Sequence, residues 1–245
     1  MKAVVLAAGT GSRLGEITKV RTKGMVPVCG KRLIDHLLNF LDLDAFDRVI
    51  VVGGFCYQDL KKHIDGLRND KITVLENRNY LKGNIFTLMR AMEEFSDDSF
   101  LITNVDHIYP RRMFEKMRGS LNGITAMCDF DRNLSSDDMK VKLEGSGKRI
   151  HGIDKRLTDY DCGYIGMTYV DSSMNKAYRK AVAETLKKFG DKAVVENVLQ
   201  LLAQDPSNAP GICDLSSIGW YEVDDESDLK KAEEGIKLHK EKFAV

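Results

Sequence analysis

The sequence KAVVLAA (residues 2–8) runs directly into GTGSRL (residues 9–14). The first part is a short apolar run with the length and composition of a buried strand. Gly9 and Gly11 interrupt it, and a loop with two glycines can turn several backbone N–H groups toward one point. Open α/β sheets bind phosphate-bearing ligands in such loops, at the carboxyl ends of their strands. The stretch therefore predicts an α/β protein with an anion-binding loop, to which Arg13 adds a forked positive charge.

Strand-like and helical segments alternate after this loop. Helical spacing of apolar residues and apolar runs predict helices at 33–41, 57–67 and 84–92 and strands at 47–54, 72–75 and 99–103. Such alternation is typical of a parallel sheet with helices on both faces. Residues 16–22 show no pattern, and Asn84 is placed to cap the helix that follows it.

The pattern changes at about residue 124. Short strands at hairpin spacing predict a smaller antiparallel part, and helices are expected at 172–189, 194–203 and 226–242. We expect a single domain over residues 1–245, divided into a first half (1–122) and a second half (123–245). No Pro- or Ser-rich linker, repeat or low-complexity tract separates the halves.

Composition excludes several classes of protein. Lys plus Arg equals Asp plus Glu, 37 of each, so net charge favours neither nucleic acid nor an anionic membrane as a partner. The five cysteines never form a C-x-x-C pair, which argues against a zinc site or a disulfide framework and for a reducing compartment. No apolar run approaches the ~18 residues of a membrane span. These features predict a protein without membrane insertion, located in the cytoplasm.

Four motifs resemble those of the sugar-phosphate nucleotidyltransferases. LAAGTGSRL (6–14) matches the signature loop of that family, and KGMVPV (23–28) followed by GKRLI (30–34) is similar to its second motif. Thr22 and Arg32 stand where that motif has prolines. NVD (104–106) resembles the family's Asp-x-Asp with Asn104 in place of the first carboxylate, and EVD (222–224) resembles its later aspartate motif.

One branch of the family is especially similar. Residues 77–88 and the segment WYEVD (220–224) resemble the small cytidylyltransferases that act on inositol phosphate or phosphocholine. The resemblance implies an α/β, Rossmann-like nucleotidyltransferase fold. Its mixed, mostly parallel central sheet would carry helices on both faces, with a small antiparallel acceptor-binding part in the second half.

The implied activity is a magnesium-dependent transfer from CTP to a phosphorylated polyol, with inositol 1-phosphate as the first choice. The products would be a CDP-alcohol, for use by a downstream enzyme, and pyrophosphate. Three alternatives remain open: a phosphocholine cytidylyltransferase, a uridylyl-, thymidylyl- or guanylyltransferase acting on a hexose 1-phosphate, and a regulatory nucleotide-binding subunit of the same fold.

Both substrates are anions, so the chemistry needs positive charge and alignment more than a protein nucleophile. The resemblance implies that Arg13 holds the departing phosphates, that Lys23 bridges the two substrates, and that Asp106 completes the catalytic set. Asp106 and Asp224 are the implied Mg²⁺ ligands, since carboxylate oxygens suit that ion. Asn104 can orient a water but brings no charge.

The remaining implied ligands fall into two groups. The nucleotide would contact Leu6, Ala8, Gly9, Gly11, Ser12, Arg13, Asn77, Gly83 and Asn84. The acceptor would contact Lys155, Asp131 and Tyr80. His107 is interpreted as structural, because an ionised phosphate needs no general base.

Overall fold

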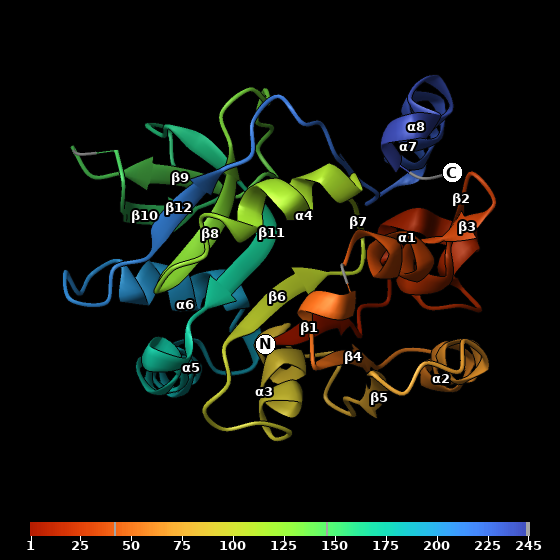
Figure 1. The fold of residues 1–245 in the computed structure, drawn as a ribbon, viewed down its shortest axis with the longest axis horizontal. Coiled ribbons are helices and arrows are strands. Elements are labelled where there is room, and N and C mark those ends of the chain that lie inside the picture. Colours follow the sequence, from red (N-terminus) through yellow and green to blue (C-terminus); the bar gives the residue numbers. More distant parts are fainter. Residues whose placement is uncertain (42, 146, 244–245) are drawn as a thin grey trace.

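The computed structural model describes three stretches of the chain: residues 1–41, 43–145 and 147–243. Their centre is a nine-stranded mixed sheet (Figure 1). Its strands are β1 (Lys2–Ala7), β4 (Arg48–Gly53), β5 (Ile72–Glu76), β6 (Phe100–Asn104), β8 (Ile124–Asp129), β9 (Lys140–Leu143), β10 (Ile150–Asp154), β11 (Cys162–Val170) and β12 (Gly211–Asp214). The order across the sheet is β10-β9-β11-β6-β1-β4-β5, and β8 pairs with β11 and β12.

Strand direction changes across the sheet. β1 lies between its parallel partners β4 and β6, with Leu6 in register with Val52 and Asn104, and β5 is parallel to β4. β11 runs antiparallel to β6 and also to β8 and β9. The predicted mixed sheet, parallel in the first half and largely antiparallel in the second, is confirmed.

Helices cover both faces of the sheet, as predicted. Alternating side chains of the central strands point to opposite faces. One core packs the face that includes Val4 and Ile50 against α3 (Ile85–Met92), α5 (Asn175–Phe189) and α6 (Val195–Leu202). The other packs the face that includes Val5 and Val51 against α1 (Leu33–Phe40), α2 (Tyr57–Gly66) and α4 (Arg111–Arg118). Within the described stretches, no helix has the length and apolarity needed to cross a bilayer.

A third core lies beside the glycine-rich loop. It joins Leu14, Val28 and Ile108 to Val223 and to α7 (Glu226–Leu238), and α8 (Lys240–Phe243) adds Phe243. Two small antiparallel pairs belong to this region: β2 (Pro27–Val28) with β3 (Lys31–Arg32), and β7 (His107–Ile108) with β13 (Tyr221–Glu222). This packing brings the segment after β13 next to the loop after β1.

Several expectations about elements are corrected by the structure. Residues 12–18, partly expected to be irregular, form 3-10 turns because Leu14 is buried and anchors them. The helix α4 was not predicted, although Met113, Phe114 and Met117 have helical spacing and are all buried. Shorter 3-10 turns are η2 (Lys23–Met25), η3 (Leu43–Ala45), η4 (Ser172–Met174) and η5 (Gly190–Lys192).

Candidate functional site

Gly11 sets the tight turn of the loop after β1. Its φ of 66° lies in the left-handed region, and a Cβ here would come within 3.1 Å of side-chain carbons of both Lys23 and Thr18. Glycine meets both conditions without strain. The Gly11 carbonyl accepts hydrogen bonds from the Leu14 N–H (2.9 Å) and the Thr18 hydroxyl (2.8 Å). The turn leaves Arg13 exposed at the carboxyl edge of the sheet.

Lys23, Asp106 and Asp224 form a largely buried ion cluster, here called the inner cluster. The Lys23 ammonium donates to Asp106 Oδ2 at 2.8 Å and to Asp224 Oδ1 at 2.5 Å. Asp106 follows β6, and its parallel neighbour β1 leads into the glycine-rich loop, so both reach the same sheet edge. Asp224 follows β13, which pairs with β7 directly after Asp106. The order of the strands therefore assembles this cluster from distant parts of the sequence.

Burial and pairing act in opposite directions on the inner cluster. Burial alone would lower the pKa of Lys23, but the carboxylates of Asp106 and Asp224 outweigh it and raise that pKa. Burial alone would raise the pKa of Asp106, but Lys23 and the neighbouring His107 hold it well below its usual range. Lys23 and Asp106 therefore stay ionised at neutral pH.

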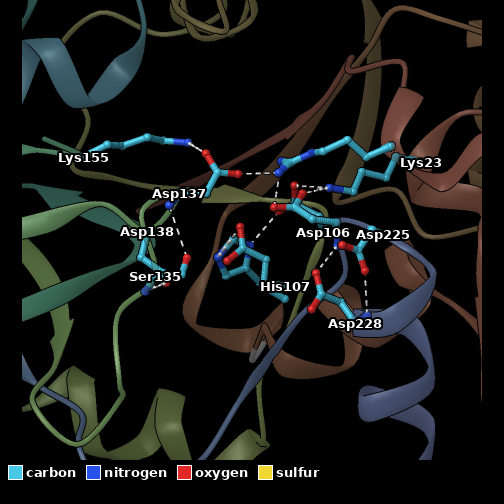
Figure 2. A network of polar contacts seen from close by, with 12 residues as sticks. Lys23, Asp106, His107, Ser135, Asp137, Asp138, Lys155, Asp225 and Asp228 are labelled. Carbon is cyan, nitrogen blue, oxygen red and sulfur yellow. Dashed lines mark hydrogen bonds and ion pairs between the residues drawn. The ribbon is translucent and has the colours of Figure 1, made fainter.

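Arg13, Asp137 and Lys155 form a second, exposed set, here called the outer cluster. Figure 2 shows the side chains of Asp137 and Lys155 pointing toward each other. Asp137 accepts hydrogen bonds from Arg13 Nη1 and, at 2.6 Å, from Lys155 Nζ. Hydrogen bonds from Lys155 and Arg13 hold the pKa of Asp137 below its usual value. Arg13 Nη2 also lies 2.8 Å from Asp224 Oδ2, so the two clusters meet at Asp224.

Both clusters border one cavity of about 280 Å³. Cations at its wall include Arg13 and Lys155, and Asn104 lines it at the end of β6. Its carboxylates are Asp106, Asp137, Asp138, Glu196, Glu222 and Asp224. The volume lies just below the range of about 300–1,000 Å³ for small-molecule sites, and a nucleotide with a second substrate needs more room.

The inner cluster has the chemistry of a magnesium site. Asp106 Oδ2 and Asp224 Oδ1 contact the same ammonium nitrogen, so two carboxylate oxygens converge on a point that a cation already occupies. Oxygen donors of this kind fit Mg²⁺. A second set of donor atoms, from Asp106, His107 and Glu222, lies within 4.8 Å of one another. Because that set includes a ring nitrogen, Asp106 with Asp224 is the better match to Mg²⁺.

Asn77 and Gly83 were expected to contact the nucleotide, but both make contacts within the protein. Asn77 is buried; its amide donates to the Thr87 hydroxyl at 3.0 Å and its Oδ1 accepts from the Asn79 N–H at 2.8 Å. A Cβ on Gly83 would lie 1.8 Å from the Ala193 carbonyl oxygen, so packing alone requires glycine there.

Asn84 lines the cavity but does not cap its own helix, contrary to the sequence-based expectation. Its Oδ1 instead accepts from the Val195 N–H at 2.8 Å, at the start of α6. The approach of α6 to α3 provides this alternative donor.

The other expected nucleotide ligands belong to the first strand and its loop. Leu6 has its side chain in the core and its carbonyl accepts from the Val105 N–H. The Ala8 carbonyl accepts from the Phe55 N–H at 3.3 Å, while Gly9 and Ser12 are exposed. The structure leaves Gly9 and Ser12 accessible to a ligand at the sheet edge.

Of the three expected acceptor ligands, only Lys155 borders the cavity. Asp131 accepts a hydrogen bond from the Ser217 N–H at 2.8 Å and lines a separate cavity of about 400 Å³. Tyr80 packs near Phe55, with a ring-centroid separation of 6.3 Å, and directly over Gly54. The structure does not bring Asp131 or Tyr80 to Lys155, because Asp131 is held by the distant Ser217 and Tyr80 packs over Gly54.

Four carboxylates of the cavity and His107 were not predicted as ligands. Asp137, Asp138 and Glu196 are acidic residues in a charged sequence, and nothing in their spacing distinguishes them. Glu222 lies in the EVD segment (222–224), of which only Asp224 was expected to bind the metal. His107 was interpreted as structural, and only its position beside Asp106 was a signal.

Comparison with known proteins gives consistent results. The chain is 25% identical over 233 residues to a "Bifunctional IPC transferase and DIPP synthase" of Thermococcus kodakarensis, covering 94% of this chain and 49% of that protein. It is 26% identical over 248 residues to a choline-phosphate cytidylyltransferase of Streptococcus pneumoniae, covering 97% and 99%. The chain spans about half the length of the bifunctional relatives that it matches.

A solved structure supports the fold. The inositol-1-phosphate CTP transferase of T. maritima superimposes with a TM-score of 0.78 at 22% identity, covering 96% of both chains. The predicted resemblance to small cytidylyltransferases is confirmed by these matches. A family model, the MobA-like NTP transferase domain, matches residues 3–134, more than half of the sequence. The chain therefore belongs to the MobA-like NTP transferase domain family.

Proposed function

We propose that this protein transfers a cytidylyl group from CTP to a phosphorylated alcohol, releasing pyrophosphate. The observation that carries the proposal is the convergence of Arg13, Lys155, Asp106 and Asp224 around one cavity, with Lys23 bonded to both aspartates. Two anionic substrates repel each other, and fixed cations at one point remove that obstacle. The names of the relatives, choline-phosphate cytidylyltransferase among them, favour CTP as the donor.

Each cation has a role suited to its position. An oxygen of the acceptor phosphate attacks the α-phosphorus of CTP, and the bond between that phosphorus and pyrophosphate breaks. Arg13, a forked donor on the exposed loop, binds the departing phosphates. Lys23, bonded to the cavity residues Asp106 and Asp224, aligns the α-phosphate with the incoming oxygen, and Lys155 holds the acceptor phosphate from the other side. Residues 1–122 thus serve mainly the nucleotide and residues 123–245 the acceptor.

Asp106 and Asp224 are the residues that would hold Mg²⁺. When bound, the ion would neutralise charge on the phosphate oxygens. The Lys23 ammonium contacts both carboxylates and so keeps them together. Asn104 at the end of β6 leaves the site with one carboxylate fewer than the family's Asp-x-Asp.

The cavity wall supports a polyol as the acceptor. The carboxylates outside the two clusters, Asp138, Glu196 and Glu222, suit hydroxyl groups, which donate hydrogen bonds, whereas a quaternary ammonium group is best bound by several aromatic faces. Tyr164 is the one phenol ring among the described lining residues. Inositol 1-phosphate is therefore our first choice, ahead of phosphocholine. The product would serve a transferase that displaces CMP from the CDP-alcohol.

Pyrophosphate release tests this proposal directly. The purified protein is incubated with each of the four ribonucleoside triphosphates and with inositol 1-phosphate, phosphocholine or glucose 1-phosphate. We expect the fastest release with CTP and inositol 1-phosphate, and loss of release on adding EDTA. Release with CTP that never exceeds that with the other triphosphates would disprove the donor assignment. No release with any pair would support a nucleotide-binding subunit instead.

A further inference from the structure

The carboxylate of Asp106 is held at both of its oxygens. Oδ2 accepts from Lys23, and Oδ1 lies 2.6 Å from Nδ1 of His107 (Figure 2). A carboxylate is acceptor-only when ionised, so Nδ1 must carry the proton of this hydrogen bond. The side chain of His107 is only 4% exposed, which keeps water from competing for Oδ1.

The ring of His107 is itself held by two neighbouring aromatic rings, which also contact each other with centroids 6.3 Å apart. The indole of Trp220 stacks on it with centroids 5.3 Å apart and planes 11° apart, and the Tyr109 ring lies 5.5 Å away at 27°. Trp220 is held in turn, because its Nε1 donates to Asp129 Oδ2 at 2.8 Å and the Arg132 guanidinium lies 4.3 Å from its ring. Packing within this cluster of rings therefore sets the direction in which Nδ1 points.

The backbone of β11 makes room for this ring. Gly166 has a φ of 75°, and a Cβ there would come within 2.8 Å of His107 Nε2. The pairing of β11 with β8 shifts register between Tyr164 and Thr168, so this glycine lies in an irregularity of the strand. Bulges of this kind redirect a strand near functional sites. The strand, the stack and the hydrogen bond all support one orientation of His107.

We propose that His107 is a positioning residue that orients the Asp106 carboxylate so that Oδ2 faces Lys23 and Asp224. This proposal rests on the proposed function. By occupying Oδ1, the imidazole leaves one oxygen directed at the point where the two carboxylates converge. Partners of this kind behind a ligand carboxylate typically change metal affinity or activity by about 10- to 100-fold when removed.

Three substitutions separate hydrogen bonding from packing. His107→Phe keeps a stacked ring but has no donor. His107→Asn places an amide N–H where Nδ1 stands, whereas His107→Gln carries its N–H toward the position of Nε2. The control is His63→Phe, since His63 also lies 2.6 Å from an aspartate, Asp35, but outside the cavity.

Two readouts are needed: kcat and KM for pyrophosphate release, and the dissociation constant of Mn²⁺ for the free protein, measured by electron paramagnetic resonance. We expect His107→Phe to lower kcat and weaken Mn²⁺ binding by about 10- to 100-fold with little change in KM for CTP. His107→Asn should recover most of both losses, and His107→Gln should not. His63→Phe should leave both unchanged.

The proposal is overturned if His107→Phe stays within twofold of wild type in both readouts. It is also overturned if His107→Asn and His107→Gln lose the same amount, which decides the question even when His107→Phe does not fold. Failure of the wild type to release pyrophosphate would refute the proposed function alone. The Mn²⁺ titration would still test His107 in that case.

Discussion

The inner and outer clusters differ mainly in their contact with solvent. Side chains of Lys23, Asp106 and Asp224 are 10, 22 and 17% exposed, whereas those of Arg13 and Asp137 are 55 and 53% exposed. Breaking a buried ion pair leaves a desolvated charge and costs about 3–5 kcal/mol, but an exposed pair contributes only about 0–1 kcal/mol. The difference shows that folding itself fixes the inner cluster, whereas the outer cluster is weak enough for the phosphates of the proposed substrates to displace it.

The largest effect is expected for Lys23→Met. Removal of the ammonium leaves two carboxylates facing each other, so the free energy of unfolding should fall by about 3 kcal/mol. Loss of a cation aimed at the reacting phosphates should lower kcat by about 10²–10³-fold. Urea unfolding and pyrophosphate release measure the two effects.

Lys19→Met is the matched control, because Lys19 makes an exposed ion pair with Glu16. It should change neither quantity appreciably. A Lys23→Met protein with wild-type stability and activity would remove the distinction between the clusters.

A smaller effect is expected for Asp137→Asn, which should improve the reaction instead of impairing it. Its carboxylate neutralises Arg13 and Lys155, the cations assigned to substrate phosphates. Removing that charge should lower KM for CTP by about two- to fivefold at low ionic strength, the range of an exposed ion pair. High salt should reduce the difference, since exposed charges are screened. Steady-state kinetics at two salt concentrations provide the measurement.

Asp159→Asn is the control for this substitution, since Asp159 pairs with Lys142 outside the cavity. It should leave KM unchanged. An increase in KM for Asp137→Asn would identify Asp137 as a ligand of the substrate instead of a competitor for its cations.

The smallest expected effect is on the pH dependence of stability, and it comes from His36, which lies outside both clusters. Burial lowers the pKa of His36, whose Nε2 lies 2.9 Å from the Val28 carbonyl oxygen. The unfolded chain therefore binds this proton more readily, and the stability from His36 is lost as pH falls below about 6.5. The lowered pKa of Asp106 has no effect in this range, because the unfolded carboxyl titrates near pH 4.

His107 changes the pH dependence of stability in the direction opposite to His36. Burial alone would lower its pKa, but Glu222 and Asp106 raise it, so its contribution is lost as pH rises. The contribution of His36 to this pH dependence is measured from the change in Tm between pH 7.5 and 5.5, compared between wild type and His36→Gln. Between pH 7.5 and 5.5 the free energy of unfolding should fall further for wild type than for His36→Gln, by up to about 1 kcal/mol. Equal losses would show that His36 does not account for the acid sensitivity.

The sequence allowed much of the inner cluster to be anticipated. Lys23, Asp106 and Asp224 were selected from short motifs, as was Arg13 of the outer cluster. Asp106 reaches the loop after β1 because parallel neighbours share a carboxyl edge, whereas the antiparallel β7–β13 pair brings Asp224 there. The outer cluster was only partly anticipated. Lys155 was identified, but its partner Asp137 lies in a loop between β8 and β9 whose path depends on distant contacts. The roles of these residues stay predictions until they are tested.

Local sequence was least informative where a residue's partner is distant. Asn84 had the features of a helix cap, yet its hydrogen bond goes to Val195. His107 had no pattern around it, and its orientation comes from Trp220 and from the room left by Gly166. Tyr80 and Asp131 were assigned to the acceptor by position in the chain, and the fold places them elsewhere.

The sequence by itself determined the alternating strands and helices, the glycine-rich turn and the residues that end the central strands. These follow from periodicity and backbone stereochemistry, which act over a few residues. Only the tertiary structure decided which charges are buried together, which stay in water, and which ring supports Asp106. Those outcomes depend on desolvation and on contacts between distant segments, and neither is encoded in any one stretch of the chain.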